Sequence, residues 1–219
     1  MIVTIDGPAA SGKGTVAKAL ALRLGFAYLD TGAMYRSVAF AALRAGMACD
    51  DAAAVESLLP AIHIEMPPER VILNGEDVTA AIRSPQVSQG ASKVAAIGPV
   101  RAFLVPQQRR IGQSQDVVSE GRDQGTVVFP DAAVKFYVIA DVQVRAGRRL
   151  KELIERGVPT TLERELAELI ERDRRDSGRA DSPLRQPPDA HVIDTSHRTV
   201  ENVLAEMEGV VRRCTSDRA

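Results

Sequence analysis

Cysteine, long apolar runs and net charge are all scarce in this chain of 219 residues. Cys49 and Cys214 lie far apart and form no CxxC pair, which argues against a disulfide framework or a metal-binding cluster and favours reduced thiols. No window approaches the roughly 18 uninterrupted apolar residues of a membrane span. The chain enters a predicted strand at Ile2 with no basic and apolar leader before it. We therefore expect a cytoplasmic protein with no membrane partner.

The charge balance excludes a second class of partner. The formal net charge is -1, so no global basic surface favours binding to nucleic acid. Hydrophobic residues make up 45% of the chain and charged residues 26%, as in an ordinary globular domain with room for a small inserted subdomain. Arginine supplies 23 of the 28 cationic side chains. Its planar fork suits phosphate oxygens, although solvated helix faces would account for most of the excess.

The start of the chain predicts a strand, a turn, a helix and a second strand. We expect a strand over Ile2–Ile5, a glycine-rich turn over Gly7–Gly14, a helix over Thr15–Leu24 and a strand over Phe26–Leu29. A second helix should follow over residues 31–45, because Asp30 or Thr31 can cap it and Gly46 can end it. This is the opening of an α/β fold.

An inserted segment with a different period follows. Ile62, Ile64 and Met66 alternate with polar residues, and a second apolar run ends in Asn74-Gly75, a strong hairpin signal. We therefore expect a small antiparallel sheet within an inserted subdomain of about residues 60–100.

The rest of the chain returns to alternating helices and strands. Two of its strands lack polar alternation, as buried parallel strands do. The expected elements are helices over 86–96, 100–110, 142–156, 162–175 and 200–212, strands over 117–118, 134–140 and 191–193, and a proline-rich loop over 176–190. Together these segments predict one α/β domain over residues 1–219, with a five-stranded parallel sheet between two layers of helices.

The turn after the first strand has the sequence GPAASGKGT and lies between a strand and a helix, which is the context that a phosphate-binding loop requires. Its glycines let successive N–H groups point at phosphate oxygens, and the helix N-terminus adds partial positive charge. Lys13 can then reach the β- and γ-phosphates. The expected ATP-binding loop is Gly7, Pro8, Ala9, Ala10, Ser11, Gly12, Lys13, Gly14 and Thr15. The sequence thus predicts a three-layer P-loop NTPase fold.

One departure from the general loop pattern is informative. Gly14 follows the lysine, and the hydroxyl is delayed to Thr15, so the usual magnesium-ligating position is altered. This variant resembles nucleoside monophosphate kinases more than GTPases or motor ATPases, and no Asn-Lys-x-Asp segment is present to recognise guanine. We expect Mg²⁺ to arrive with ATP, and we assign no metal ligand in the chain.

A kinase that joins two polyanions needs several arginines that converge on their phosphates. Candidate arginines follow the predicted strands and helices along the whole chain. Each one alone is explained at least as well by a solvated salt bridge, since Glu171, Asp173 and Asp176 supply partners at helical spacing.

Four segments behind the loop, in the order LDTGAMYR, SKVAAIGPVR, SEGRDQGTVVFPDA and ERDRRDSGR, resemble the bacterial cytidylate kinases over nearly the whole chain. The hairpin ending in LNGEDV is similar to the CMP-binding insert of that family. SEGRDQGTVVFP is unlike the corresponding segment of adenylate, guanylate or thymidylate kinases. The resemblance implies transfer of the γ-phosphoryl group of ATP to CMP or dCMP, and it suggests a monomer.

The resemblance also implies which residues bind the acceptor. For cytosine they are Thr31, Ser92, Arg101 and Asp123; for the phosphate Arg36, Arg122 and Arg179; and for the sugar Arg172 and Asp176. The chemistry is consistent, because cytosine offers an amino donor beside two acceptors, and a carboxylate with a guanidinium and a hydroxyl complements that edge. Uracil would present an oxygen to the carboxylate.

Catalysis should then depend on positioning and electrostatics. A phosphate monoester is mostly dianionic at neutral pH, so no general base is required. We assign catalysis to Lys13, Arg122 and Arg179. The family's lid over ATP falls at about residues 145–160, with Arg148 and Arg149 as ATP contacts, although a plain amphipathic helix explains the same pattern.

Two other functions remain open from the residues. A small-metabolite kinase of shikimate-kinase type would share the loop and the sheet but has no reason to carry the hairpin insert. An ATP-responsive binding module without turnover would not need the convergent set of Lys13, Arg122, Asp123 and Arg179. The sequence leaves the preference among CMP, dCMP and UMP undecided.

Overall fold

A five-stranded parallel sheet forms the centre of the computed structural model, which describes residues 1–216. Across the sheet the strands are β2 (Ala27–Asp30), β6 (Val117–Gly121), β1 (Ile2–Asp6), β7 (Val134–Ile139) and β8 (His191–Asp194). Each pairs with its neighbours in parallel, so the predicted parallel sheet is confirmed. Because β1 lies between β6 and β7, the order of the strands along the chain reverses there, and ligands bind outside the carboxyl ends of the strands at such a point.

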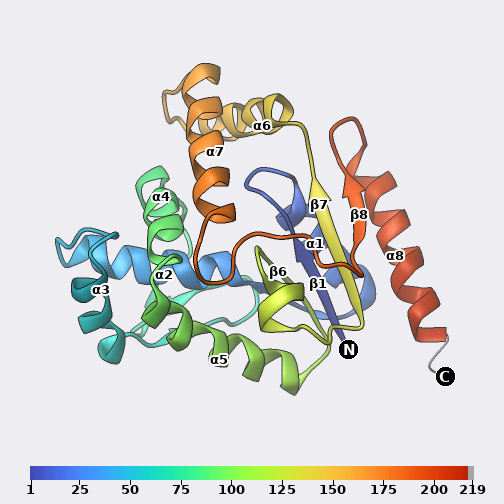
Figure 1. Cartoon of the computed structure of the whole chain (residues 1–219), viewed down its shortest axis with the longest axis horizontal. Helices are drawn as coiled ribbons and strands as arrows, with labels where there is room; N and C mark the ends of the chain where they lie inside the picture. The colour runs from blue at the N-terminus through green and yellow to red at the C-terminus, as the bar shows by residue number, and fades with distance from the viewer. Residues whose placement is uncertain (217–219) are drawn as a thin grey trace.

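Helices cover both faces of this sheet and make the predicted three layers (Figure 1). The helices α1 (Lys13–Leu24) and α8 (Val200–Ser216) lie over one face, and α2 (Thr31–Arg44) and α5 (Gly98–Ser114) lie over the other. Neighbouring residues of β6 show how both faces are buried. Val117 packs in the cluster formed by α2 and α5, whereas Val118 packs with α1 and α8. Burial on both faces explains why this strand shows no polar alternation.

The insert contains the expected small antiparallel sheet, with strands β3 (Ile64–Glu65), β4 (Ile72–Leu73) and β5 (Glu76–Asp77). Asn74 and Gly75 join β4 to β5 with φ angles of 51° and 84°, so the hairpin prediction is confirmed. The helix α3 (Ala52–Leu58) precedes this region, which also contains α4 (Pro85–Val94) and short 3₁₀ turns at Leu59–Ala61 and Ala81–Arg83.

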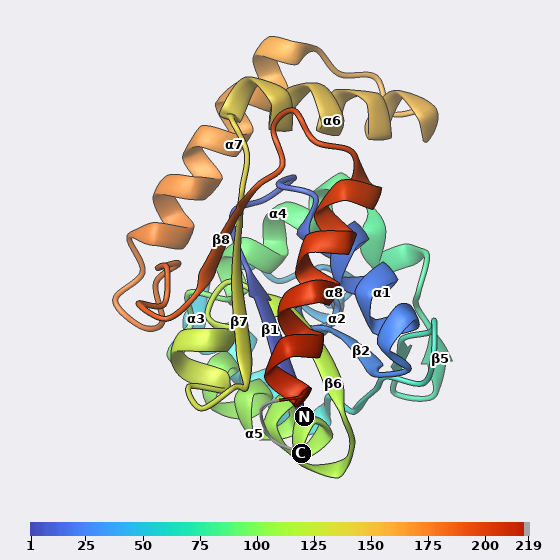
Figure 2. The same ribbon diagram turned by 90° about the vertical axis from the view of Figure 1, so that its right-hand side faces the viewer.

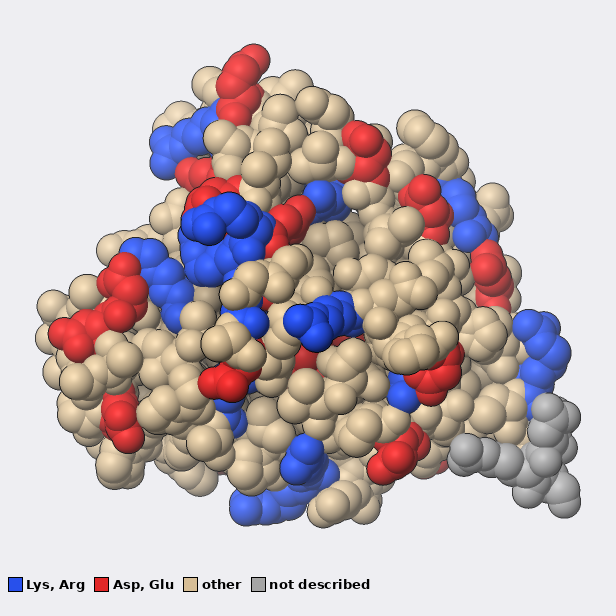
Figure 3. Space-filling view, viewed as in Figure 1, with Lys and Arg blue, Asp and Glu red and all other residues tan. Residues whose placement is uncertain are grey.

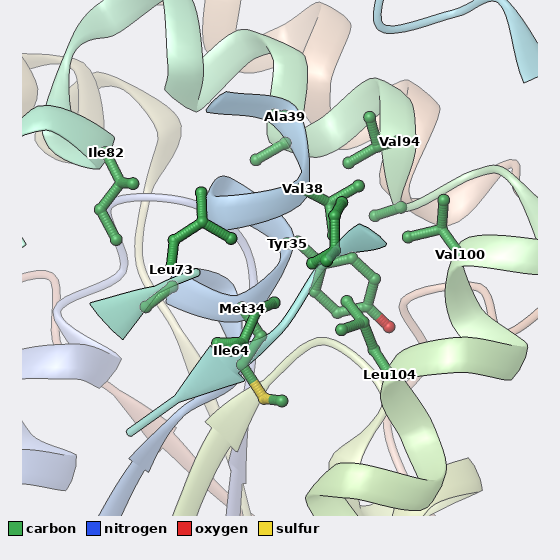
Figure 4. Packing of buried hydrophobic residues seen from close by; sticks show 14 of the residues in the cluster. Met34, Tyr35, Val38, Ala39, Ile64, Leu73, Ile82, Val94, Val100 and Leu104 are labelled. Atoms are coloured by element: carbon green, nitrogen blue, oxygen red, sulfur yellow. The ribbon is translucent and has the colours of Figure 1, made fainter. Parts of the chain in front are cut away.

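The insert is not a separate body, because its core is continuous with that of α2. Met34 and Val38 of α2 pack against Ile64 and Leu73 of the small sheet within one buried cluster (Figure 4). The same cluster includes buried residues of α4 and α5. The helices α2, α4 and α5 therefore share one apolar core with the small sheet.

Two further helices stand at the carboxyl ends of the strands. Figure 2 shows α6 (Val142–Glu155) across the top of the molecule and α7 (Leu162–Ser177) descending beside it. Both helices carry many charged residues, and only Ala146, Leu153 and Leu169 are buried apolar residues on them. No helix within residues 1–216 is both long and apolar enough to cross a membrane.

Several boundaries differ from the sequence prediction. α1 begins at Lys13 rather than Thr15, because Gly12 takes a left-handed φ of 86° and the helix starts directly after it. α5 continues to Ser114 through Pro106, and α7 reaches Ser177. The sequence also did not predict the π-helical turn at Gln124–Val128, which follows β6.

Candidate active site

The phosphate-binding loop runs from the end of β1 to the start of α1, as the sequence predicted. Gly7 has a φ of 153°, and a Cβ at this position would lie 2.1 Å from the carbonyl oxygen of Val138, so no side chain fits. Ala10 and Gly12 also have positive φ. These conformations curl the main chain tightly ahead of the helix N-terminus, which is the shape that lets backbone amides surround a phosphate.

Side chains from α6 and from the residue that follows β8 hold the loop through its carbonyl groups. Arg145 donates to the Ala9 carbonyl at 3.2 Å and pairs with Asp173 of α7 at 2.7 Å. Arg148 and Thr195 both donate to the Ser11 carbonyl, at 3.4 and 2.7 Å. Because these contacts use carbonyl oxygens, they fix the loop without occupying its N–H groups.

Lys13 is buried at the base of the loop. Its Nζ donates to the Pro8 carbonyl at 3.1 Å, so the side chain folds back over the turn. Burial, together with the nearby positive charge of Arg122, lowers the pKa of Lys13 to about 7. The negative charge of a bound polyphosphate would raise this pKa and favour the ammonium form.

Beside the loop, one pocket brings together residues from α1, α2, α4, α5, β6 and α7 and from the segments that follow β6 and α7. All nine predicted acceptor residues line it together with Lys13. They are Thr31, Arg36, Ser92, Arg101, Arg122, Asp123, Arg172, Asp176 and Arg179. The pocket is strongly polar, and its cations face carboxylates of the same pocket.

Asp176 organises the side of this pocket formed by α7. It accepts hydrogen bonds from Ser92 at 3.0 Å, from Arg122 Nε at 2.9 Å and from Arg179, and Arg172 lies 3.9 Å away. Burial alone would raise the pKa of the Asp176 carboxyl, but the surrounding guanidinium groups hold it well below its usual value. The carboxylate therefore stays ionised and keeps two arginines aimed into the pocket.

A second buried ion pair lies at the other end of the pocket. Arg101 and Asp123 are 5% and 3% exposed and hydrogen-bond directly to each other. Arg101 also donates to the Tyr35 hydroxyl at 3.0 Å and lies over its ring. Burial raises the pKa of Asp123, and the neighbouring arginines only partly oppose this rise. The pair presents a carboxylate and a guanidinium on one wall.

The floor of the pocket is formed where β2 meets β6. Thr31 donates to the Glu120 carbonyl at 2.7 Å, which ties the start of α2 to β6. Asp30 caps α2 by accepting from Ala33 N at 2.8 Å and also pairs with Arg36 at 3.5 Å. Glu120 is 8% exposed, and its Oε2 has no hydrogen-bond partner among residues 1–216. Burial raises the pKa of its carboxyl, although Lys13 opposes the rise.

The surface repeats this pattern of mixed charge. In Figure 3, basic side chains gather between α4 and α7 and beside the loop below α7, with acidic side chains next to them. No extended surface of one sign covers this face. The basic side chains are therefore gathered locally beside acidic ones, which agrees with the near-zero net charge of the chain.

The comparisons with known proteins point to one family. A family model for cytidylate kinase matches residues 3–213. A cytidylate kinase of Solibacter usitatus is 49% identical over 221 aligned residues, which span 100% of this chain and 95% of that protein. One from Geobacter sp. strain M21 is 46% identical over 216 residues, spanning 97% and 93%. The chain belongs to the cytidylate kinase family. Membership makes it a phosphotransferase that uses ATP, and neither the shikimate-kinase type nor the non-catalytic module is favoured.

The fold of this cytidylate kinase family member also has a counterpart among solved structures. An uncharacterized protein from Eubacterium ventriosum matches with a TM-score of 0.56 over 97% of this chain and 98% of that one. The two are 12% identical, so this likeness supports the fold alone.

Some residues of the site were not assigned from the sequence of this cytidylate kinase family member. Arg145, which holds the loop, is one of them. Arg149, which the resemblance implied as an ATP contact, instead pairs with Glu152 and Glu165. It lines a second cavity between α4 and the helices α6 and α7. Glu120 lies inside a segment that the resemblance covers, but no role was given to it. Its position two residues after the strand predicted over 117–118, next to Gly121-Arg122, was the available signal.

Proposed function

We propose that this protein transfers the γ-phosphoryl group of ATP to CMP or dCMP, giving ADP and CDP or dCDP. The observation that carries the proposal is the convergence of all nine predicted acceptor residues, with Lys13, on one pocket beside the phosphate loop. In sequence these residues span Lys13 to Arg179, so local structure alone would not gather them. The cytoplasm, where ATP and nucleoside monophosphates meet, is the proposed compartment.

The loop is the proposed donor site. ATP would place its β- and γ-phosphates against the loop amides and Lys13, which then exchanges the Pro8 carbonyl for phosphate oxygens. The contacts of Arg145 and Arg148 with loop carbonyls support a rigid cradle that needs no reorganisation at the moment of transfer. The side chain of Arg148, on α6, reaches the loop at the Ser11 carbonyl, so Arg148 is the proposed contact between lid and ATP.

The arginines around Asp176 are the proposed acceptor site. The CMP phosphate would lie between Arg36, Arg122 and Arg179, whose charges reduce the repulsion between the two phosphate groups as they approach. The acceptor oxygen then attacks the γ-phosphorus in line, and the bond to the β-phosphate oxygen breaks. Lys13 stabilises the charge on the transferred group.

The buried pair at the far end of the pocket is the proposed base reader. The Asp123 carboxylate would accept a hydrogen bond from the N4 amino group of cytosine, and Arg101 would donate to the acceptor edge of the base. Ser92 lies within reach of the same wall, although its hydroxyl now donates to Asp176. Uracil would leave the carboxylate facing an oxygen, which disfavours UMP.

A divalent cation fits beside the loop, since Glu120 offers a buried carboxylate oxygen with no hydrogen-bond partner among residues 1–216. A Cβ at Gly14 would approach the Glu120 oxygens at 3.4 and 3.5 Å, so the missing side chain leaves space for this carboxylate where other loops have a hydroxyl. Glu120 is therefore the proposed protein group for Mg²⁺. Mg²⁺ would neutralise charge on the β- and γ-phosphates.

The proposal also gives roles to the two regions around the pocket. Residues of about 60–100 would form the CMP-binding insert, and residues of about 145–160 would form the lid that excludes water from the acceptor position. Arg156, at the end of α6, donates to the Arg83 carbonyl of the insert at 2.8 Å, which supports a contact between lid and insert during closure. The protein would act as a monomer without a nucleic-acid or membrane partner.

The decisive experiment is an assay of ADP production from ATP and Mg²⁺ with separate CMP, dCMP, UMP, AMP, GMP and shikimate. We expect rapid turnover with CMP and dCMP, and a value of kcat/KM for UMP lower by about a hundredfold or more, because the buried carboxylate would face an oxygen. Preference for another acceptor would overturn the assignment of Arg101 and Asp123. ATP binding without transfer to any acceptor would support the non-catalytic module.

A further inference from the structure

Asp6, the last residue of β1, is a fully buried carboxylate to which the proposed reaction gives no role. Its Oδ1 accepts from the backbone N–H of Gln124 at 2.9 Å, and its Oδ2 accepts from that of Gly125 at 2.8 Å. Both oxygens are thus used on one side, by the first two amides of the π-helical turn that follows β6. Burial raises the pKa of Asp6 to about 7 despite these two donors.

This arrangement bridges the two halves of the site. Asp6 directly precedes Gly7 of the phosphate loop, and Gln124 directly follows Arg122 and Asp123. In the sheet Asp6 lies opposite Gly121 of β6 and Tyr137 of β7, so its main chain is held from both sides. The Asp6 side chain is therefore held in a fixed position, and its two hydrogen bonds fix the turn after β6 to the sheet.

The later amides of the turn donate to carbonyl groups at its start, as those of Val127 and Val128 do to Asp123, whereas its first two amides need a partner outside it. The Gln124 side chain accepts from Ser119 at 2.8 Å and donates to Gln108, which holds the side chain but not the amides. The first amides of a helical turn have no partner within the turn. Two acceptors on one side chain satisfy both amides and set the direction in which the preceding Arg122 and Asp123 leave the sheet.

We propose that Asp6 is a positioning residue for the acceptor, because it locks the turn that aims Arg122 at the CMP phosphate and Asp123 at the base. This inference rests on the proposed function. It assigns Asp6 to the acceptor side although the residue adjoins the donor loop in sequence.

The test compares Asp6→Asn with Thr4→Val in the full-length protein. An asparagine keeps one acceptor but turns an amino group toward the second backbone N–H, so the turn must shift. We expect the KM for CMP to rise by about tenfold or more, while the KM for ATP changes by less than about twofold, because the sheet holds the loop side. Thr4 lies on the same strand, is fully buried, and its hydroxyl has no partner among residues 1–216, so Thr4→Val should change neither KM.

The outcomes separate cleanly. Equal increases in both KM values, or none, for Asp6→Asn would overturn the inference and leave the proposed function intact. Failure of the wild-type protein to phosphorylate CMP would overturn the proposed function first. If Asp6→Asn does not fold, amide hydrogen exchange of the wild-type protein decides: protection of the Gln124 and Gly125 amides comparable to that of β1 is expected, and fast exchange at both would contradict the lock.

Discussion

The proposed donor and acceptor ends of this site are held by different kinds of contact. At the donor end, Arg145, Arg148 and Thr195 hold main-chain carbonyl groups of the loop. At the acceptor end, Asp176 and Asp123 hold the side chains of arginines directly. One end is fixed through backbone geometry and the other through internal ion pairs.

This difference has a consequence for ligand binding. The loop amides stay available, so ATP can bind without displacing a charged partner. The acceptor arginines already have carboxylates beside them, so CMP must share or replace these pairs. Such pairs stabilise little by themselves, because desolvation offsets much of their attraction, but they hold the cations in place. The binding of CMP should therefore be more sensitive than the binding of ATP to single charge changes among the residues that hold each end.

The largest effect is expected at the donor end, from Lys13→Ala. Removing this ammonium group should lower kcat by about a thousandfold, since it acts on charge that develops during transfer. Stability should not fall, because burial already disfavours the charged lysine. Lys18→Ala, on the exposed side of the same helix, is the matched control for steady-state kinetics. Wild-type kcat in Lys13→Ala would refute the mechanism.

A pair of substitutions on α7 tests the comparison itself. Asp176→Asn should raise the KM for CMP by about a hundredfold, because Arg122 and Arg179 lose the carboxylate that aims them. Asp173→Asn breaks the ion pair with Arg145 instead, so it should raise the KM for ATP more than the KM for CMP. Initial-rate kinetics with each substrate varied gives both KM values. If both variants raised the KM for the same substrate, the two ends of the site would not be held independently of each other.

The lowered pKa of the Asp176 carboxyl also predicts a pH dependence of stability. Its folded-state pKa is depressed, so its contribution is present above the unfolded value of 3.8 and is lost as the pH falls below that value. The wild-type advantage in free energy of unfolding over Asp176→Asn should therefore be constant from pH 5 to pH 7 and shrink at lower pH. Urea unfolding at several pH values measures it, and an advantage that grew toward low pH would contradict the ion-pair arrangement.

The contrast also explains what could be predicted from the sequence. The loop was predicted from the residues, because its glycines, lysine and flanking elements lie within one short segment. The partners of Asp176 could not be predicted in this way, since Ser92 and Arg122 lie 84 and 54 residues away from it along the chain. Their membership of one site came from the resemblance. Arg145 was missed because the charge pattern of its helix does not distinguish it from Arg149.

A substitution at the proposed metal site should have an intermediate effect on activity, through Mg²⁺ and not through the contacts that hold either end. Glu120→Gln removes the charge of the free carboxylate oxygen and should raise the Mg²⁺ concentration for half-maximal activity by about tenfold. Competition by Mg²⁺ against Mn²⁺ bound with ADP, followed by electron paramagnetic resonance, gives a second readout without turnover. Glu165→Gln, on α7, serves as the control. Unchanged metal affinity in Glu120→Gln would remove this residue from the metal site.

The lowered pKa of Lys13 predicts a proton uptake that the acceptor end should lack. The pKa is about 7 in the free protein, and bound phosphates should raise it, so binding favours the charged form. ATP affinity should then fall as the pH rises from 7.5 to 9, by up to about tenfold per pH unit. Calorimetry in buffers of different ionisation enthalpy counts the protons. Lys13→Met should abolish the uptake, and an uptake that persisted in this variant would assign it elsewhere.

The smallest expected effect concerns the contact between the two regions that surround the ends. Arg156 donates to the Arg83 carbonyl, and the Arg83 guanidinium pairs with Asp30 at 2.8 Å, next to Arg36. This chain of contacts joins α6 to the acceptor floor. Since one exposed hydrogen bond contributes about 0.5–1.5 kcal/mol, Arg156→Ala should raise the KM for CMP by only about threefold. Arg164→Ala, whose salt bridge with Glu168 stays within α7, should leave it unchanged. An equal effect of both substitutions would mean that surface charge, and not contact between lid and insert, sets this affinity.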